Sequence, residues 1–154
     1  MAETRQLCTF VVGGLFLGVD VRDVQEVMLY QEMTAVPTAP PVIRGLINLR
    51  GEIVTALDLR RQLGMPDRDG GEPPMNIVVR DGRDVAVSLL VDEIGEVVQA
   101  DEADFEPVPT TLTGPAAQLL LGSYKLPDRL LLLLDTEKAR TAGTGIRTDE
   151  GDQQ

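Results

Sequence analysis

Residues 45–60 read GLINLRGEIVTALDLR, two apolar runs separated by Asn48-Leu49-Arg50-Gly51. Apolar runs on both sides of a short polar break predict a β-hairpin whose turn is the break itself. Asn at the first position and Gly at the fourth are typical of a type I turn, so Leu49 and Arg50 are the expected exposed tip. Because both runs are apolar on both faces, the strands are expected to lie between two covering layers.

The rest of the chain alternates apolar and polar residues with a period of two, which favours further β-hairpins. Their turn signals are Gly13-Gly14, Asp81-Gly82 and Pro127-Asp128. Helix signals are short, and each starts at an aspartate that could act as an N-cap. The expected helical segments are 21–27, 58–64 and 135–140.

Many short strands with regular turn signals indicate an all-β barrel or sandwich. The loop at 65–74 is rich in Pro, Gly and Asp and is flanked by strands, so it is interpreted as a divide between two small barrels packed together. Hydrophobic residues make up 43% of the chain but aromatic residues only 3%, which predicts an aliphatic core. The polar residues 141–154 are expected to form a disordered tail.

The amino-acid composition excludes most of the common catalytic and metal sites. The chain has no histidine, which removes the usual catalytic triads and most zinc sites. The single cysteine, Cys8, alternates with apolar neighbours and is expected in the core. Residues 101–106 read DEADFE but lack the spacing of an EF-hand loop, so they are interpreted as a solvated acidic turn. Neither a cofactor nor a metal is expected, although a carboxylate-dependent hydrolase stays open as an alternative.

Charge and hydropathy restrict the partners. The net charge is −11, and the fourteen basic residues are scattered, which disfavours nucleic acid and anionic membranes. The chain shows no signal-peptide pattern and no apolar run of about 18 residues, so a soluble intracellular protein without membrane insertion is expected.

Several segments of the chain resemble those of a known family. The segment VIRGLINLRGEIVTALDLR at 42–60 is similar to the signature of the CheW family, the adaptors of bacterial chemotaxis arrays. The opening hairpin followed by GVDVRDVQEV, the segment LLVDEIGEV and the segment RLLLLLDTEK are similar to further parts of the family, in the right order. The resemblance covers residues 6–140.

The resemblance implies a single CheW-like domain over 1–140, made of two five-stranded SH3-like β-barrels with short helices and a C-terminal helix. It implies no catalysis, and a role as a cytoplasmic adaptor between chemoreceptor tips and the regulatory domain of a CheA-type histidine kinase, held at the inner face of the membrane through receptor arrays. The positions that match the family's receptor groove are Val24, Glu26, Val27, Asn48 and Arg50. Gly45 and Gly51 match its glycines and are expected to be structural turn residues.

Two further expectations follow from this comparison. Glu26 is the expected intramolecular partner of Arg50, in a pair that directs the guanidinium more than it stabilises the fold. Thr55 stands where the family usually has proline, which leaves the local geometry of that strand open.

An adaptor of a different chemosensory pathway is an alternative within the family, and a free-standing adaptor is favoured over a domain fused to a receiver or kinase.

Overall fold

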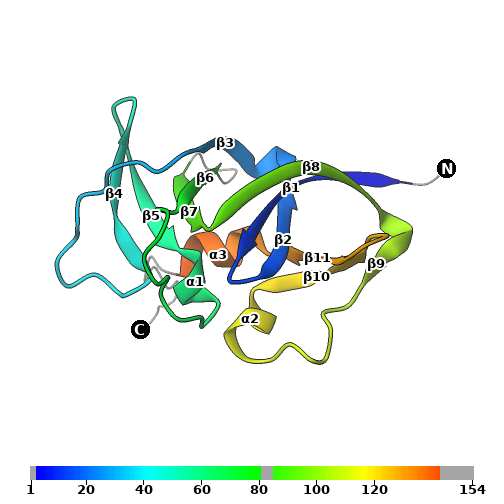
Figure 1. Ribbon diagram of the computed structural model, residues 1–154. Helices are drawn as coiled ribbons and strands as arrows, with labels where there is room; N and C mark the ends of the chain where they lie inside the picture. The colour runs from blue at the N-terminus through cyan, green and yellow to red at the C-terminus, as the bar shows by residue number, and fades with distance from the viewer. Residues whose placement is uncertain (1–2, 81–84, 143–154) are drawn as a thin grey trace, which may run out of the picture.

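The computed structural model describes residues 3–80 and 85–142 and is shown in Figure 1. These residues form two β-sheets with a few short helices, as the sequence predicts. The first sheet has the strand order β8 (Glu93–Asp101), β1 (Thr4–Val12), β2 (Leu15–Asp20), β11 (Leu130–Leu134), β10 (Leu120–Lys125) and β9 (Phe105–Glu106). The second has the order β3 (Val24–Met28), β6 (Met75–Arg80), β7 (Ala86–Val91), β5 (Glu52–Asp58) and β4 (Ile43–Leu49). The first sheet has one strand more than expected, because the two-residue strand β9 pairs with β10.

The two sheets are not divided at the loop 65–74, and that interpretation is wrong. The loop joins α1 (Leu59–Gln62) to β6, and both β5 and β6 belong to the second sheet. The chain instead changes sheet after β2 and again after β7, where Asp92 alone separates β7 from β8. Composition marks a flexible loop, but it does not show which strands pair on either side of it.

The main core lies between the sheets. It contains aliphatic side chains from both sheets, such as Val12, Leu17, Leu57 and Leu89, and Ala139 of α3 (Thr136–Ala142). Figure 1 shows α3 at the centre of the molecule, between the two sheets. On its other face the first sheet has one smaller apolar cluster, and the second sheet has two. As a result every residue of β7 is buried, which explains its unbroken run of small and apolar residues.

The outer half of the β4–β5 hairpin does not follow that pattern. Along β4 the burial alternates, with Gly45, Ile47 and Leu49 buried and Asn48 exposed. Ile53 near the start of β5 is 61% exposed. The prediction that both faces of this hairpin are covered therefore holds for the end of β5 that lies far from the turn, and it is wrong near the turn.

Asp92 connects four parts of the chain. Its carboxylate accepts hydrogen bonds from the backbone N–H of Gly13 (2.8 Å), from Nε and Nη2 of Arg60 (3.0 and 2.9 Å) and from Nη2 of Arg68 (2.6 Å). Partial burial would by itself raise the pKa of Asp92, but the hydrogen bonds from Arg60 and Gly13 and the charges of Arg68 and Arg60 outweigh it and lower that pKa below its ordinary value. Asp92 thus fixes the turn after β1, α1 and the loop 65–74 relative to β7.

Two of the three predicted helices are confirmed. Asp58 accepts a hydrogen bond from the N–H of Arg61 at the start of α1, and Gly64 follows the helix with a φ of +77°. Asp135 accepts a hydrogen bond from the N–H of Lys138 in α3. The predicted tail begins two residues too early, because α3 includes Thr141 and Ala142; its remaining residues, like the turn at Asp81-Gly82, lie outside the described part of the chain.

The predicted helix over 21–27 is wrong. Asp20 does accept a hydrogen bond from the N–H of Arg22, but only a single 3-10 turn, η1 (Val21–Asp23), follows. Val24 and Val27 then pair with β6 in an antiparallel ladder. β-Branched residues fit a strand better than a helix, and here a neighbouring strand is available to them.

Residues 102–104 form the 3-10 turn η2 (Glu102–Asp104), capped by Asp101, which agrees with the predicted acidic turn. Cys8 is half-buried against the main core, and burial, together with the charge of Asp20, raises the pKa of its thiol. None of the helices among the described residues is long and apolar enough to cross a membrane.

Candidate protein-binding site

The turn between β4 and β5 lies one residue later than the sequence suggests. Leu49 pairs with Glu52, so Arg50 and Gly51 are the two residues of the turn. Their φ values are +53° and +89°, which define a type I′ turn rather than the predicted type I. Asn48 accepts a hydrogen bond from the N–H of Gly51 at its Oδ1 (2.9 Å), which confirms that Asn48 supports the backbone here.

Leu49 is not part of the tip. It is only 8% exposed and packs with Val54, Val78 and the half-buried Met28 inside the second sheet. The shift of the turn by one residue makes Leu49 the last strand residue, and the period of two then directs it to the buried face. The prediction of an exposed leucine is wrong, and Arg50 alone projects from the tip.

Arg50 forms the predicted ion pair with Glu26. Its Nη2 lies 2.7 and 2.8 Å from the two carboxylate oxygens of Glu26, and the side chains are 67% and 24% exposed. Glu26 lies on β3 and Arg50 follows β4, the two edge strands of the second sheet. The sheet therefore curls until its edges approach each other, and this ion pair spans the place where they meet.

The segment after β3 continues this closure along β4. Thr34 and Leu46 exchange two backbone hydrogen bonds of 2.8 Å each. Gly45 permits the close approach, because a Cβ atom there would lie 2.7 Å from the carbonyl oxygen of Thr34. Gly45 is thus a structural glycine within a strand, and its assignment to a turn is wrong; Gly51 is the turn glycine.

The two valines of the candidate site differ in their surroundings. Val24 is half-buried against the main core, whereas Val27 is 46% exposed. Val27 pairs with Ile77, which faces the core between the sheets, while Glu26 pairs with Val78 on the curled inner face. Glu26 and Arg50 are brought together, Asn48 supports the turn that carries Arg50, and Val27 lies on the other face of β3.

Exposed apolar side chains near the tip were not identified from the sequence. The register places Ile53 opposite Asn48, and the pairing of Thr55 with Val87 places Ile53 next to Val85 on the same face. Ile53 and Val85 are 61% and 52% exposed. Strict alternation from the correct turn would have identified Ile53, whereas its proximity to Val85 depends on sheet topology. Thr55 itself pairs regularly on both sides, so its replacement of proline leaves no irregularity.

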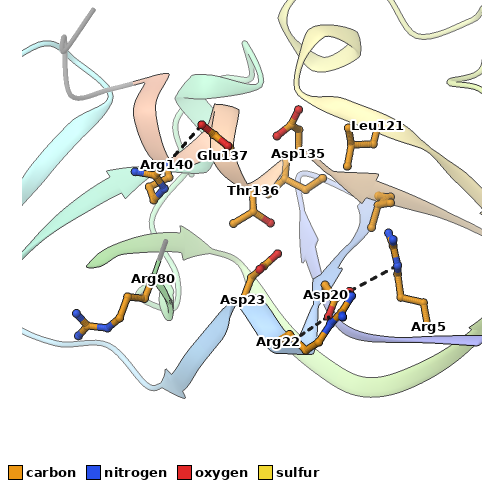
Figure 2. A pocket seen from close by; sticks show the side chains of 12 residues that line it. Arg5, Asp20, Arg22, Asp23, Arg80, Leu121, Asp135, Thr136, Glu137 and Arg140 are labelled. Carbon is orange, nitrogen blue, oxygen red and sulfur yellow. Dashed lines mark hydrogen bonds and ion pairs between the residues drawn. The ribbon is translucent and has the colours of Figure 1, made fainter. Parts of the chain in front are cut away.

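A charged cleft of about 570 Å³ is lined by residues of the first sheet, of η1 and of the α3 region, and by Arg80 of the second sheet. Figure 2 shows Arg5, Asp20 and Arg22 on one wall, with residues of the α3 region across from them. Hydrogen bonds from Arg22, opposed by partial burial and assisted by the charges of Arg22 and Arg5, lower the pKa of Asp20. Arg80 also lines the cleft and forms an ion pair with Glu52 at the hairpin tip (3.0 Å), so the cleft and the tip are connected.

This arrangement offers recognition chemistry. The tip presents a guanidinium, a carboxylate and apolar side chains, and the cleft adds charges of both signs. Among residues 3–80 and 85–142, no three His, Cys, Asp or Glu side chains gather as a metal ion would require. A fold of two packed β-sheets with such a surface defines a small β module suited to binding other proteins.

Comparison with known proteins identifies the module. The family model described as the CheW-like domain matches residues 6–142, and the chain belongs to this family. Chemotaxis protein CheW of Klebsiella aerogenes is 31% identical over 134 residues, covering 87% of this chain and 80% of that protein. The Treponema pallidum protein of the same name is 27% identical over 139 residues, covering 88% and 82%.

A solved structure agrees with the fold. The crystal structure of scaffolding protein TtCheW from Thermoanaerobacter tengcongensis is similar with a TM-score of 0.77 and 29% sequence identity. The similarity covers 86% of this chain and 89% of that one. The resemblance found from the sequence is thereby confirmed, as is the class of fold.

Proposed function

We propose that this protein is a chemotaxis coupling adaptor that links the cytoplasmic tips of chemoreceptors to the regulatory domain of a CheA-type histidine kinase. Membership of the CheW-like family supports this role, as does the similarity to proteins named for chemotaxis and scaffolding. The adaptor acts without catalysis. It is cytoplasmic and reaches the inner face of the membrane through receptor arrays.

The observation that carries the site proposal is the ion pair between Glu26 and Arg50. Arg50 uses only Nη2 in this pair, and no hydrogen bond from its Nε or Nη1 occurs among the described residues. A guanidinium held in this way can donate to a carboxylate or to the carbonyl groups at a helix end of the receptor. Glu26 fixes the direction of the guanidinium, and the strength of the contact comes from the partner.

Apolar contacts complete the proposed surface. Val27 is exposed on the edge strand β3, and Ile53 is exposed on β5, the strand next to the opposite edge strand β4. A helical receptor tip would bury these side chains along one face, in the manner of an amphipathic helix in a groove. Val24 supports this surface from its half-buried position, and Asn48 holds the turn that presents Arg50.

The test is assembly with receptor and kinase. The purified protein should co-sediment with receptor-containing membranes and a CheA-type kinase, and should raise kinase autophosphorylation only when receptor is present. Arg50→Ala should fold normally and weaken the ternary assembly. Lys125→Ala is the matched control, because Lys125 forms an exposed ion pair with Glu106 on the other sheet. Normal assembly by Arg50→Ala, or unfolding of this variant, would contradict a contact role for Arg50.

Two other functions are less well supported. An adaptor of a different chemosensory pathway, for example one for motility on surfaces, would use the same fold and differ in its receptor. A carboxylate-dependent hydrolase is not favoured, since the relatives reported above are named as chemotaxis and scaffolding proteins. Co-purification of the partners from the native cell would show whether the adaptor serves chemotaxis or a different chemosensory pathway.

A further inference from the structure

A second cavity lies away from the proposed adaptor site, where three helices meet. It has a volume of about 530 Å³ and is lined by residues of α1, α2 (Gly114–Gln118) and α3 and by Val42. Val42, Pro115 and Leu119 give it an apolar wall. This volume is typical of pockets that hold small organic molecules. We call this space the helix cavity.

The charge around the helix cavity is opposite to that of the whole protein. The chain has a net charge of −11, yet the lining includes Arg61 and Lys138 and no acidic residue. Three other cavities of similar volume all include an acidic side chain. Local positive charge beside an apolar wall favours an anionic ligand with an apolar body.

The two cations differ in how far they are neutralised. Arg61 is paired with Asp67 at 2.9 Å and lies 3.6 Å from Asp58. Lys138 makes a hydrogen bond of 3.3 Å to the carbonyl oxygen of Gln118, and no ion pair to it occurs within the part of the chain that the structure describes. Among the described residues, Lys138 is therefore the cation of this cavity that has no ion-pair partner.

Gln62 adds a polar group to the cavity lining. It is 7% exposed, and its Nε2 donates to the carbonyl oxygen of Ala139 at 3.0 Å. Its Oε1 is buried and has no hydrogen-bond donor among the described residues. Buried acceptors without a donor are rare in folded proteins. Since Oε1 is covered, a small turn of the amide would be needed to meet a donor from the cavity.

We propose that the helix cavity binds a small organic carboxylate with an apolar ring and an N–H or O–H donor. The carboxylate pairs with Lys138, and the ring packs on Val42, Pro115 and Leu119. After a small turn of the amide, the donor meets Oε1 of Gln62. This site is separate from the surface around Arg50 and Glu26, so it holds or fails independently of the adaptor function.

The probe for the test is indole-3-acetate, which has all three features. Titration into the isotope-labelled protein, followed by two-dimensional NMR, should give saturable shifts confined to residues around Val42, Leu119 and Lys138. Indole-3-acetamide, which lacks the charge, should bind at least fivefold more weakly. 1-Methylindole-3-acetate, which lacks the N–H, should also bind more weakly than the parent.

The chain offers a matched pair of lysine variants, because Lys125 and Lys138 are its only lysines. Lys138→Met should remove the preference for the acid over the amide, whereas Lys125→Met should keep it. The absence of shifts at millimolar probe, shifts scattered elsewhere, or equal affinity for acid and amide would overturn the proposal. Equal affinity for the N-methylated probe would overturn the contact with Gln62.

Discussion

Replacing Arg50 by asparagine should separate the role of this residue in binding from its role in folding. Arg50 has a φ of +53°, in the left-handed region, where a residue other than glycine or asparagine costs roughly 1–2 kcal/mol. Asparagine followed by glycine is the preferred pair for a type I′ turn. Arg50→Asn therefore relieves backbone strain in the hairpin while it removes the guanidinium.

The loss of the ion pair opposes this gain only weakly. Arg50 and Glu26 are 67% and 24% exposed, and exposed pairs contribute about 0–1 kcal/mol. If asparagine recovers about 1 kcal/mol of backbone strain, the net change lies between about 0 and 1 kcal/mol of stabilisation. For a chain of this length that corresponds to a rise in melting temperature of roughly 0–4 °C. Arg50→Ala also loses the ion pair but does not relieve the backbone strain, so it should be the less stable of the two variants.

Urea and thermal unfolding measure the stability, and co-sedimentation with receptor and kinase measures the assembly. We expect Arg50→Asn to be as stable as the wild type or more so, and to assemble poorly. A loss of more than about 1 kcal/mol in the free energy of unfolding would show that the pair, and not the turn, governs local stability. Stable protein with wild-type assembly would refute Arg50 as a contact.

Three further predictions concern the fold. Asp92→Asn should lower the free energy of unfolding by about 2–4 kcal/mol in urea titrations, because it weakens a partly buried group that accepts four hydrogen bonds; a change below about 0.5 kcal/mol would contradict this role. Because the pKa of Asp92 is lowered on folding, its stabilisation is present above about pH 4 and is lost as the pH falls through the lower folded value. The difference in stability between wild type and Asp92→Asn should therefore be constant from pH 5 to 7 and shrink below pH 4, and a difference independent of pH would contradict the assignment. Gly45→Ala should destabilise the protein by about 1–3 kcal/mol in the same urea assay, since the new Cβ would press on the carbonyl oxygen of Thr34, and wild-type stability would show that the segment at 33–34 shifts freely.

Local signals in the sequence predicted local structure well. The hairpins at Gly13-Gly14 and Pro127-Asp128 and the helix that starts at Asp58 each depend on a few neighbouring residues. The helix over 21–27 failed because Val24 and Val27 have a helical spacing, whereas in the structure they pair with β6, some fifty residues further along the chain, with a register shift between Val24 and Glu26. A short apolar pattern cannot report such a distant partner.

In the candidate site, too, some features depend on neighbouring residues and others on strands that are distant in the sequence. Glu26 and Arg50 were expected to pair, and they do, yet the reason is the curl of a sheet whose two edge strands carry them. The turn was misplaced by one residue because Asn48 and Gly51 satisfy the type I pattern, whereas the strand register makes Arg50 and Gly51 the turn. Because of this error of one residue, Leu49 was predicted to be exposed although it is buried, and the exposure of Ile53 was not predicted.

The most direct test of the proposed site is an NMR titration of the labelled protein with a receptor-tip fragment. The largest shifts should fall on Glu26, Val27, Arg50 and Ile53, and Arg50→Asn should weaken binding while the spectrum stays that of a folded protein. Shifts on the far edge of the first sheet at β8 instead, or binding of the fragment by Arg50→Asn as tight as that of the wild type, would contradict this site.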